Sequence, residues 1–146
     1  MQSAAKDSPI ILREGRESDR NLVLQSWIRS HRGYWFGRKV ADASYSKGQE
    51  WLCKRLLDRC ALLVAAFDED PDFIAGWACT STGTVHYVWI RPALRRKGIA
   101  KRLLAPYLDQ PTTYTHPPAW WLEEDGEHIP AAWSYNPYAA FELAAT

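Results

Sequence analysis

Three features of the sequence predict a single α/β domain with a mixed, mostly antiparallel sheet flanked by helices. The chain has 146 residues, of which 47% are hydrophobic and 24% charged, which is typical of one globular domain with one core. Three short apolar runs follow one another between residues 61 and 91, separated by turn residues. Segments with helical spacing lie on both sides of them. We expect residues 1–8 to be a flexible N-terminus and residues 9–146 to form the domain.

The elements before the apolar runs are expected to alternate between strand and helix. Residues 9–13 indicate a short strand, and Ser18 or Asp19 can cap a helix that ends near Gly33. Residues 34–47 are aromatic and basic without a clean period, which predicts a loop or a broken helix. A second helix is expected from Ser46 or Gly48 to near Cys60.

The apolar runs predict three consecutive strands, and weaker patterns follow them. The run at 61–67 is typical of a strand buried on both faces, and 73–80 and 84–91 follow it after turns at 68–72 and 82–83. The later expected elements are a helix after Gly98 that Pro106 ends or bends, a strand at 112–116, an irregular segment at 117–130, and a helix opened by Asn136-Pro137 that runs through Leu143.

Charge and cysteine content argue against several classes of protein. The formal net charge is +1, whereas nucleic-acid-binding proteins usually carry a strongly basic excess. The three cysteines, Cys53, Cys60 and Cys79, lack the spacing of a zinc site, so we expect reduced, mostly buried thiols and no metal. Residues 1–8 lack the apolar stretch of a signal peptide, and no apolar segment is long enough to span a membrane. The sequence therefore predicts a cytoplasmic protein that does not bind membranes.

A basic cluster around Gly98 joins the third strand to the helix after it. Where a helix starts, its first amides have no intrahelical acceptor, and the helix dipole adds positive potential, so a pyrophosphate fits there. Gly98 allows close approach of the backbone, and Ala100 keeps the next turn small. Arg95, Arg96, Lys97 and Lys101 add positive charge.

This cluster resembles the cofactor-binding motif of the GNAT family, the GCN5-related N-acetyltransferases. The family pattern Q/R-x-x-G-x-G/A is present here as Arg95-x-x-Gly98-x-Ala100, after a strand that contains Val88, Ile90 and Pro92 at the family's spacing. The resemblance covers about residues 9–114 in the order of elements, and only 85–104 in motif detail. It implies a GNAT-like acyl-CoA N-acyltransferase fold.

The resemblance also implies a cosubstrate, a reaction and the residues that bind the cosubstrate. The chain is expected to move an acetyl group from acetyl-CoA to a primary amine by direct attack, without a metal. In the family, acyl-CoA lies across a splayed pair of parallel strands. Carried onto this sequence, the pantetheine would bind the backbone of Val88, Trp89 and Ile90. The pyrophosphate would bind a loop and helix start formed by Arg95, Arg96, Lys97, Gly98, Ile99, Ala100 and Lys101.

His86 is the candidate general base. It lies six residues before Pro92, an offset at which members similar to the arylalkylamine N-acetyltransferases carry a catalytic histidine, and imidazole accepts protons near neutral pH. Thr84, at the other common base position, cannot act as a base. The alternative is a histidine that only donates and accepts hydrogen bonds within the sheet.

The candidate general acid is less clearly marked. The family's tyrosine motif N-x-x-A-x-x-x-Y is present in part, as Asn136 and Ala139, but Leu143 occupies the tyrosine position. Tyr138 is therefore the predicted acid, with Tyr135, Tyr114 or water as alternatives.

Aromatic residues are numerous, with eight tryptophans in the chain, so some are expected to line a pocket. A loose cluster of His116, Glu123, Glu124, Glu127 and His128 is expected to be a solvated acidic loop that could face a cationic amine. Candidate walls of the acceptor site, each with core packing as the alternative, are Trp35, Phe36, Trp120, Trp121 and Trp133.

Two other classes of function stay open. One is a noncatalytic acyl-CoA-binding or protein-interaction module, favoured by the missing tyrosine. The other is a small nucleic-acid-binding protein, although nucleic acid is expected at most as a substrate. Little chain follows the last helix, so either the fold is truncated at its C-terminus or a homodimer partner completes it. The sequence does not choose among small amines, aminoglycosides, protein amines and amino-modified nucleotides as acceptor.

Overall fold

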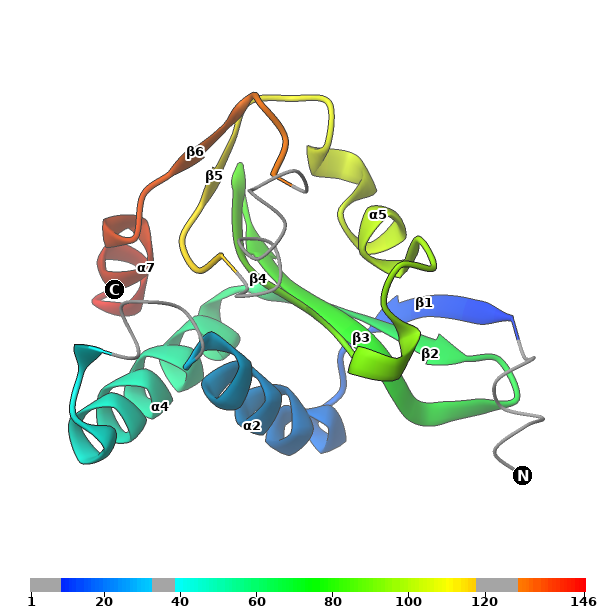
Figure 1. Cartoon of the computed structure of the whole chain (residues 1–146), viewed down its shortest axis with the longest axis horizontal. Coiled ribbons are helices and arrows are strands. Elements are labelled where there is room, and N and C mark those ends of the chain that lie inside the picture. The colour runs from blue at the N-terminus through cyan, green and yellow to red at the C-terminus, as the bar shows by residue number, and fades with distance from the viewer. Residues whose placement is uncertain (1–8, 33–38, 118–128) are drawn as a thin grey trace.

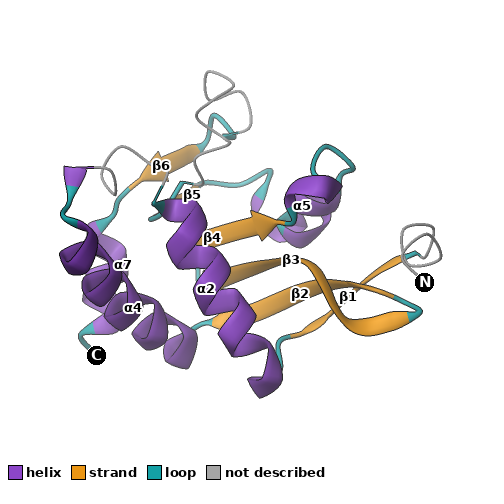
Figure 2. Ribbon diagram, turned by 60° about the horizontal axis from the view of Figure 1, so that its bottom comes forward, coloured by secondary structure: helices purple, strands orange, loops and turns teal. Residues whose placement is uncertain are grey.

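A six-stranded sheet with strand order β1-β2-β3-β4-β5-β6 forms the centre of the molecule (Figure 1). The computed structural model describes residues 9–32, 39–117 and 129–146. Helices α2, α4 and α7 pack on one face of the sheet, and α5 packs on the other. Figure 2 shows α2 crossing in front of the central strands.

The strands pair in sequence order. β1 to β4 are antiparallel neighbours, whereas β4 pairs with β5, and β5 with β6, in parallel. This arrangement confirms the predicted mixed, mostly antiparallel sheet. The elements are β1 (Ile10–Glu14), α2 (Arg20–His31), α4 (Asp42–Arg59), β2 (Ala61–Phe67), β3 (Asp70–Ser81), β4 (Thr84–Ile90), α5 (Ile99–Leu103), β5 (Thr112–Tyr114), β6 (Trp133–Tyr135) and α7 (Tyr138–Ala144), with 3-10 turns at Glu17–Asp19, Pro92–Leu94 and Ala105–Tyr107.

Several details differ from the sequence expectations. Strand β3 begins at Asp70, within the expected turn at 68–72, and β5 ends at Tyr114 rather than at residue 116. Helix α4 begins at Asp42 rather than at Ser46 or Gly48, because Tyr45 is 5% exposed and its hydroxyl donates to the Ile28 carbonyl at 2.6 Å. Strand β6 was not expected. Helix α5 has only five residues, since Pro106 has no amide to continue the helical bonds.

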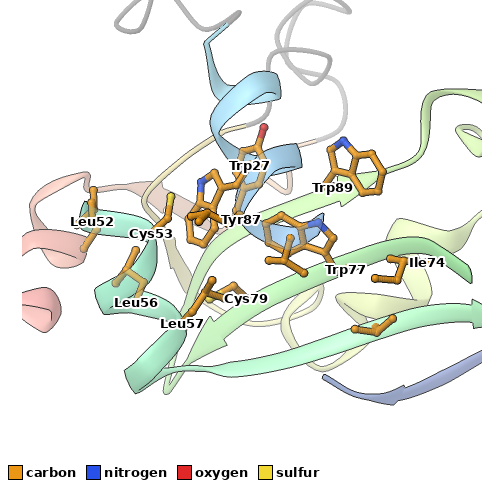
Figure 3. Packing of buried hydrophobic residues seen from close by; sticks show 14 of the residues in the cluster. Trp27, Leu52, Cys53, Leu56, Leu57, Ile74, Trp77, Cys79, Tyr87 and Trp89 are labelled. Atoms are coloured by element: carbon orange, nitrogen blue, oxygen red, sulfur yellow. The ribbon is translucent and has the colours of Figure 1, made fainter. Parts of the chain in front are cut away.

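Strand β4 is buried on both faces because its side chains alternate between two apolar clusters. Tyr87 and Trp89 belong to the cluster under α2 and α4, whereas Val88 and Ile90 belong to the cluster under α5. In the first cluster, drawn in Figure 3, the rings of Trp27 and Tyr87 stack with centroids 5.4 Å apart. The core therefore fixes β4 in position from both sides.

A buried ion pair fixes the start of α2. The Asp19 carboxylate accepts hydrogen bonds from Arg13 Nη1 and Nη2 at 2.7 and 2.9 Å and from the Arg16 amide at 2.7 Å. Both side chains are largely buried, at 11% exposed for Arg13 and 5% for Asp19. The Arg13 guanidinium, followed by the backbone amide of Arg16, outweighs burial and lowers the pKa of Asp19. Asp19 thus stands at the N-cap position of α2, but its carboxylate binds Arg13 and the Arg16 amide and makes no capping hydrogen bond to the helix.

Asp19→Asn should lower the free energy of unfolding by about 3 kcal/mol, because it leaves a buried guanidinium without its counter-charge. A carboxyl group whose folded pKa is lowered stabilises the native state above its unfolded pKa, and this stabilisation is lost as pH falls through the folded value. In urea denaturation, the free energies of unfolding of wild type and variant should therefore differ by a constant amount above about pH 4. Below that pH the difference should shrink.

Asp72→Asn is the matched control, because Asp72 pairs with Arg16 at 3.1 Å on the surface and is 87% exposed. It should change the free energy of unfolding by less than about 1 kcal/mol. Equal effects of the two substitutions would contradict the stabilising role of the buried pair.

Candidate active site

Strands β4 and β5 run side by side over only a short distance. Their pairs are Thr84 with Thr113 and Val85 with Tyr114, and the Thr115 amide donates to the Val85 carbonyl at 3.2 Å. Beyond this point β4 continues to Ile90, whereas β5 leads away from it (Figure 1). The two strands thus form a V whose apex lies at Val85 and Thr115.

A β-bulge at His86 lies next to this apex. Cys79 pairs with Tyr87 and Thr80 with Val85, so His86 is the extra residue of β4. Farther along, the Arg91 amide donates to the Ala75 carbonyl of β3 at 2.8 Å. Because backbone groups alternate in direction along a strand, those of Val88 and Ile90 point away from β3 and toward the opening of the V.

The loop after β4 has a backbone conformation that can bind an anion. Arg96 and Gly98 have positive φ angles of 65° and 81°, and such turns direct neighbouring amides to one side, where they can hold an anion. The Arg102 amide is bonded to the Gly98 carbonyl at 3.2 Å, so the amides of residues 99–101 precede the first intrahelical bond. Since α5 is short, its dipole is small, and these amides and the exposed basic side chains contribute more positive potential than the dipole does.

The basic side chains of this loop differ in their surroundings. Arg96, Lys97 and Lys101 are exposed, whereas Arg95 is partly buried and its Nε donates to the Ile90 carbonyl at 3.1 Å. Arg95 therefore ties the loop to the end of β4. A Cβ at Gly98 would meet no other atom within 4 Å. In the absence of a ligand, glycine is therefore favoured at this position by its positive φ angle and not by close packing.

Three buried histidines meet at the apex of the V. His86 is 1% exposed, with Nε2 at 2.9 Å from Ser81 Oγ and Nδ1 at 3.1 Å from Thr115 Oγ1. The same Thr115 hydroxyl lies 2.8 Å from His116 Nδ1. The rings of His116 and His31 contact each other edge to face, with centroids 4.8 Å apart. One hydroxyl thus connects the candidate base to a second imidazole.

Burial keeps two of these imidazoles neutral. It lowers the pKa of His31 to about 4, and it lowers the pKa of His116 well below its usual value, with smaller contributions from His31 and His86. His31 was not singled out from the sequence, and His116 was grouped with the acidic loop rather than with His86. The three residues lie on α2, on β4 and just after β5, so no local spacing indicates their contact.

The remaining predicted site residues are not brought together at this apex. Tyr138, in the first turn of α7, is 71% exposed. Trp133 is 7% exposed in the α5-side cluster, and its indole N–H donates to the Tyr107 carbonyl at 3.0 Å, so most of its ring packs in the core. Several predicted residues lie outside the described part of the chain: Trp35, Phe36, Trp120, Trp121, Glu123, Glu124, Glu127 and His128.

A groove of about 660 Å³ runs between α2 and the end of β4. Polar side chains of α2, among them Asn21, Gln25 and Arg29, line one side, and Trp89 and Arg95 line the other. The groove leads from the solvent toward the strand that borders the V.

Neither a membrane span nor a metal cluster is found in the described segments. No helix there is long and apolar enough to cross a bilayer. Over the same residues, no three or more His, Cys, Asp or Glu side chains are grouped so that they could hold a metal ion.

The family model described as the acetyltransferase (GNAT) family matches residues 23–111. This range is more than half of the chain and contains β4, the loop at 95–98 and α5. The chain belongs to the GNAT family. The resemblance seen in the sequence is thereby confirmed.

Among solved structures, this GNAT chain is similar to the apo form of YjaB from Escherichia coli, with 23% identity and a TM-score of 0.52 over 68% of this chain and 65% of that chain. It matches yncA from Salmonella typhimurium, solved with its cofactor acetyl-CoA, with 20% identity and a TM-score of 0.46 over 70% and 62% of the two chains. It matches the aminoglycoside N-acetyltransferase AAC(6')-Iy in complex with CoA, with 16% identity and a TM-score of 0.40 over 94% and 84%.

The likeness to YjaB is a likeness of fold, and the match spans just under two thirds of the YjaB chain. A search of curated proteins finds no match.

Proposed function

We propose that this GNAT chain transfers an acetyl group from acetyl-CoA to a primary amine by direct attack of the amine on the thioester. The observation that carries the proposal is the V between β4 and β5, together with the loop after β4, in which Arg96 and Gly98 have positive φ angles. An extended chain with a diphosphate at one end fits this combination of an open strand edge and an anion-binding turn.

Each part of acetyl-CoA would have a partner in the structure. The pantetheine would bind the edge of β4 at Val88, Trp89 and Ile90, where the groups of Val88 face the opening. The diphosphate would bind the amides of residues 96–101, with Arg96, Lys97 and Lys101 adding charge. Arg95 would hold the loop against β4 and contribute to the positive potential.

The attacking amine must lose a proton, and we assign its acceptance to His86. The His86 ring and Thr115 are both buried, at 1% and 2% exposed, so the proton would enter at His116 and pass through the Thr115 hydroxyl, which contacts both His86 Nδ1 and His116 Nδ1. A hydroxyl between two imidazoles can accept a proton on one side and donate one on the other. Tyr138 stays the candidate donor to the leaving thiolate, with water as the alternative.

The acceptor would enter by the groove between α2 and the end of β4. Trp35, Phe36, Trp120 and Trp121 remain the candidate acceptor walls, whereas Trp133 packs in the core on the α5 side. The alternative function, a noncatalytic acyl-CoA-binding module, is favoured by one observation, namely Leu143 at the family's tyrosine position.

Acetyl-CoA titration with a panel of amines, at two salt concentrations, tests the proposal. We expect saturable binding together with release of the CoA thiol and an amine product heavier by one acetyl group. Binding without turnover on any amine would indicate the noncatalytic module. Salt-dependent DNA binding without affinity for CoA would indicate a nucleic-acid-binding protein.

A further inference from the structure

Two cysteines and His86 meet at one end of the sheet. Cys60 lies between α4 and β2, Cys79 lies on β3, and His86 is the bulge residue of β4. Leu62 pairs with Cys79, so Cys60, two residues before Leu62, directs its side chain to the same face as Cys79. Cys60 and Cys79 therefore lie diagonally across the β2–β3 ladder, and the Cys60 sulfur interacts with the Cys79 thiol and more weakly with the His86 ring.

The cysteines differ in their access to solvent. Cys60 is partly exposed and lines a pocket of about 320 Å³, whose other side chains include Arg16 and Arg20. Cys79 and Cys53 are both 0% exposed. A small oxidant can therefore reach Cys60 directly, whereas Cys79 is reached through Cys60.

The cysteines also differ in charge. The hydrogen bond with Cys79 outweighs burial and, together with the smaller effects of His86 and Arg59, lowers the pKa of Cys60. The pKa of Cys79 is raised, because its thiol keeps its proton in that hydrogen bond and is buried. Of the two sulfurs, Cys60 is therefore the one favoured as the thiolate, which is the nucleophilic form, and Cys79 is the one favoured as the thiol.

We propose that Cys60 and Cys79 form a redox-modification site whose oxidant is a peroxide. The Cys60 thiolate attacks one peroxide oxygen, the O–O bond breaks, and a sulfenic acid and hydroxide form, the hydroxide taking a proton to become water. The Cys79 sulfur then attacks the Cys60 sulfur, and its proton leaves with the hydroxyl as a second water. The net change converts two thiols and one hydrogen peroxide into one disulfide and two waters.

The geometry allows the second step with a small movement of the chain. Cys60 and Cys79 lie diagonally across two neighbouring strands with their side chains on one face, and the residue pairs of β2 begin at Ala61. Cys60 therefore lies at the junction just outside the paired strand, where it can shift without breaking the ladder.

Oxidation would also change the surroundings of His86, because Cys60 is one of its partners. This consequence rests on the proposed function, in which His86 accepts the proton of the amine. We expect the disulfide form to acetylate more slowly and a dithiol reductant to restore the rate.

The site is tested by treating the full reduced chain with a small excess of hydrogen peroxide, counting thiols and mapping disulfide-linked peptides by mass spectrometry. The three thiols of the wild type should fall to one, with a Cys60–Cys79 linked peptide that dithiothreitol reverses. Cys53→Ser is the matched control and should lose both of its thiols. Cys60→Ser should keep both of its thiols at the same dose.

Cys79→Ser gives a second reading, because the sulfenic acid at Cys60 should then persist and be trapped by dimedone. Oxidation of Cys60 no faster than that of Cys53, or a sulfinic acid at Cys60 while Cys79 stays a thiol, would overturn the proposal. Thiol mapping does not depend on acetyl transfer, so a failure of the proposed function leaves this result interpretable.

Discussion

Gly98→Glu should weaken the binding of acetyl-CoA at least about 100-fold, since like charges brought together cost several kcal/mol and 1.4 kcal/mol is a factor of ten. The new carboxylate would compete for the amides that are proposed to receive the diphosphate and would repel it. Gly98 has a φ angle of 81°, so the side chain also costs about 1–2 kcal/mol of backbone strain. Isothermal titration calorimetry measures the affinity, and thermal unfolding shows whether the chain stays folded.

Gly83→Glu is the control variant, because it adds the same charge and a similar backbone strain at a position outside the proposed diphosphate loop. Gly83 lies in the turn between β3 and β4 with a φ angle of 68°, and, as at Gly98, a Cβ there would meet nothing within 4 Å. This variant should lose a similar amount of stability but bind acetyl-CoA within about twofold of wild type. Unchanged affinity in Gly98→Glu, or an equal loss in both variants, would remove the diphosphate site from the loop.

The central sheet could be predicted from sequence because its signals are local. The apolar run at 61–67 and the alternating run at 84–91 are bounded by turn residues, and the structure confirms strands β2, β3 and β4 there. The burial of these strands could be predicted without knowledge of their neighbours in the sheet, since hydrophobic runs of this length are typical of buried strands.

Elements that depend on distant partners could not be predicted in the same way. Strand β6 has three residues and is defined by its pairing with β5, and its sequence alone does not mark it as a strand. The first turn of α4 is stabilised by Tyr45, whose partner on α2 is 17 positions away in sequence. Tertiary contacts override local propensity at both places.

The candidate site shows the same division. The loop around Gly98 is contiguous, so its motif and its glycine were visible in the sequence. The hydrogen bond from Arg95 Nε to the Ile90 carbonyl could not be predicted, because the direction of a side chain depends on the local backbone conformation. The contact of His86 with Thr115 spans 29 positions, and the Cys60–Cys79 contact joins two elements whose register no local pattern sets.

His86→Gln should lower kcat at neutral pH by about 100-fold or more, a usual contribution of a general base, and leave the affinity for acetyl-CoA within about twofold. Glutamine can still hydrogen-bond to Ser81 and Thr115, but it cannot take up a proton. Steady-state rates at saturating amine measure kcat, and isothermal titration calorimetry measures the affinity for acetyl-CoA.

Thr115→Val tests whether the proton reaches the buried ring through the hydroxyl. Valine keeps the shape of threonine but cannot relay a proton, so kcat should fall by about 10-fold or more. Thr112→Val is the matched control on the same strand, because its hydroxyl donates to the carbonyls of Tyr107 and Gln110, away from His86, and it should cost only about 1 kcal/mol of stability. Equal kcat in the two threonine variants, together with an unchanged kcat in His86→Gln, would leave His86 as a structural residue of the bulge, because its other nitrogen faces Ser81 within the sheet.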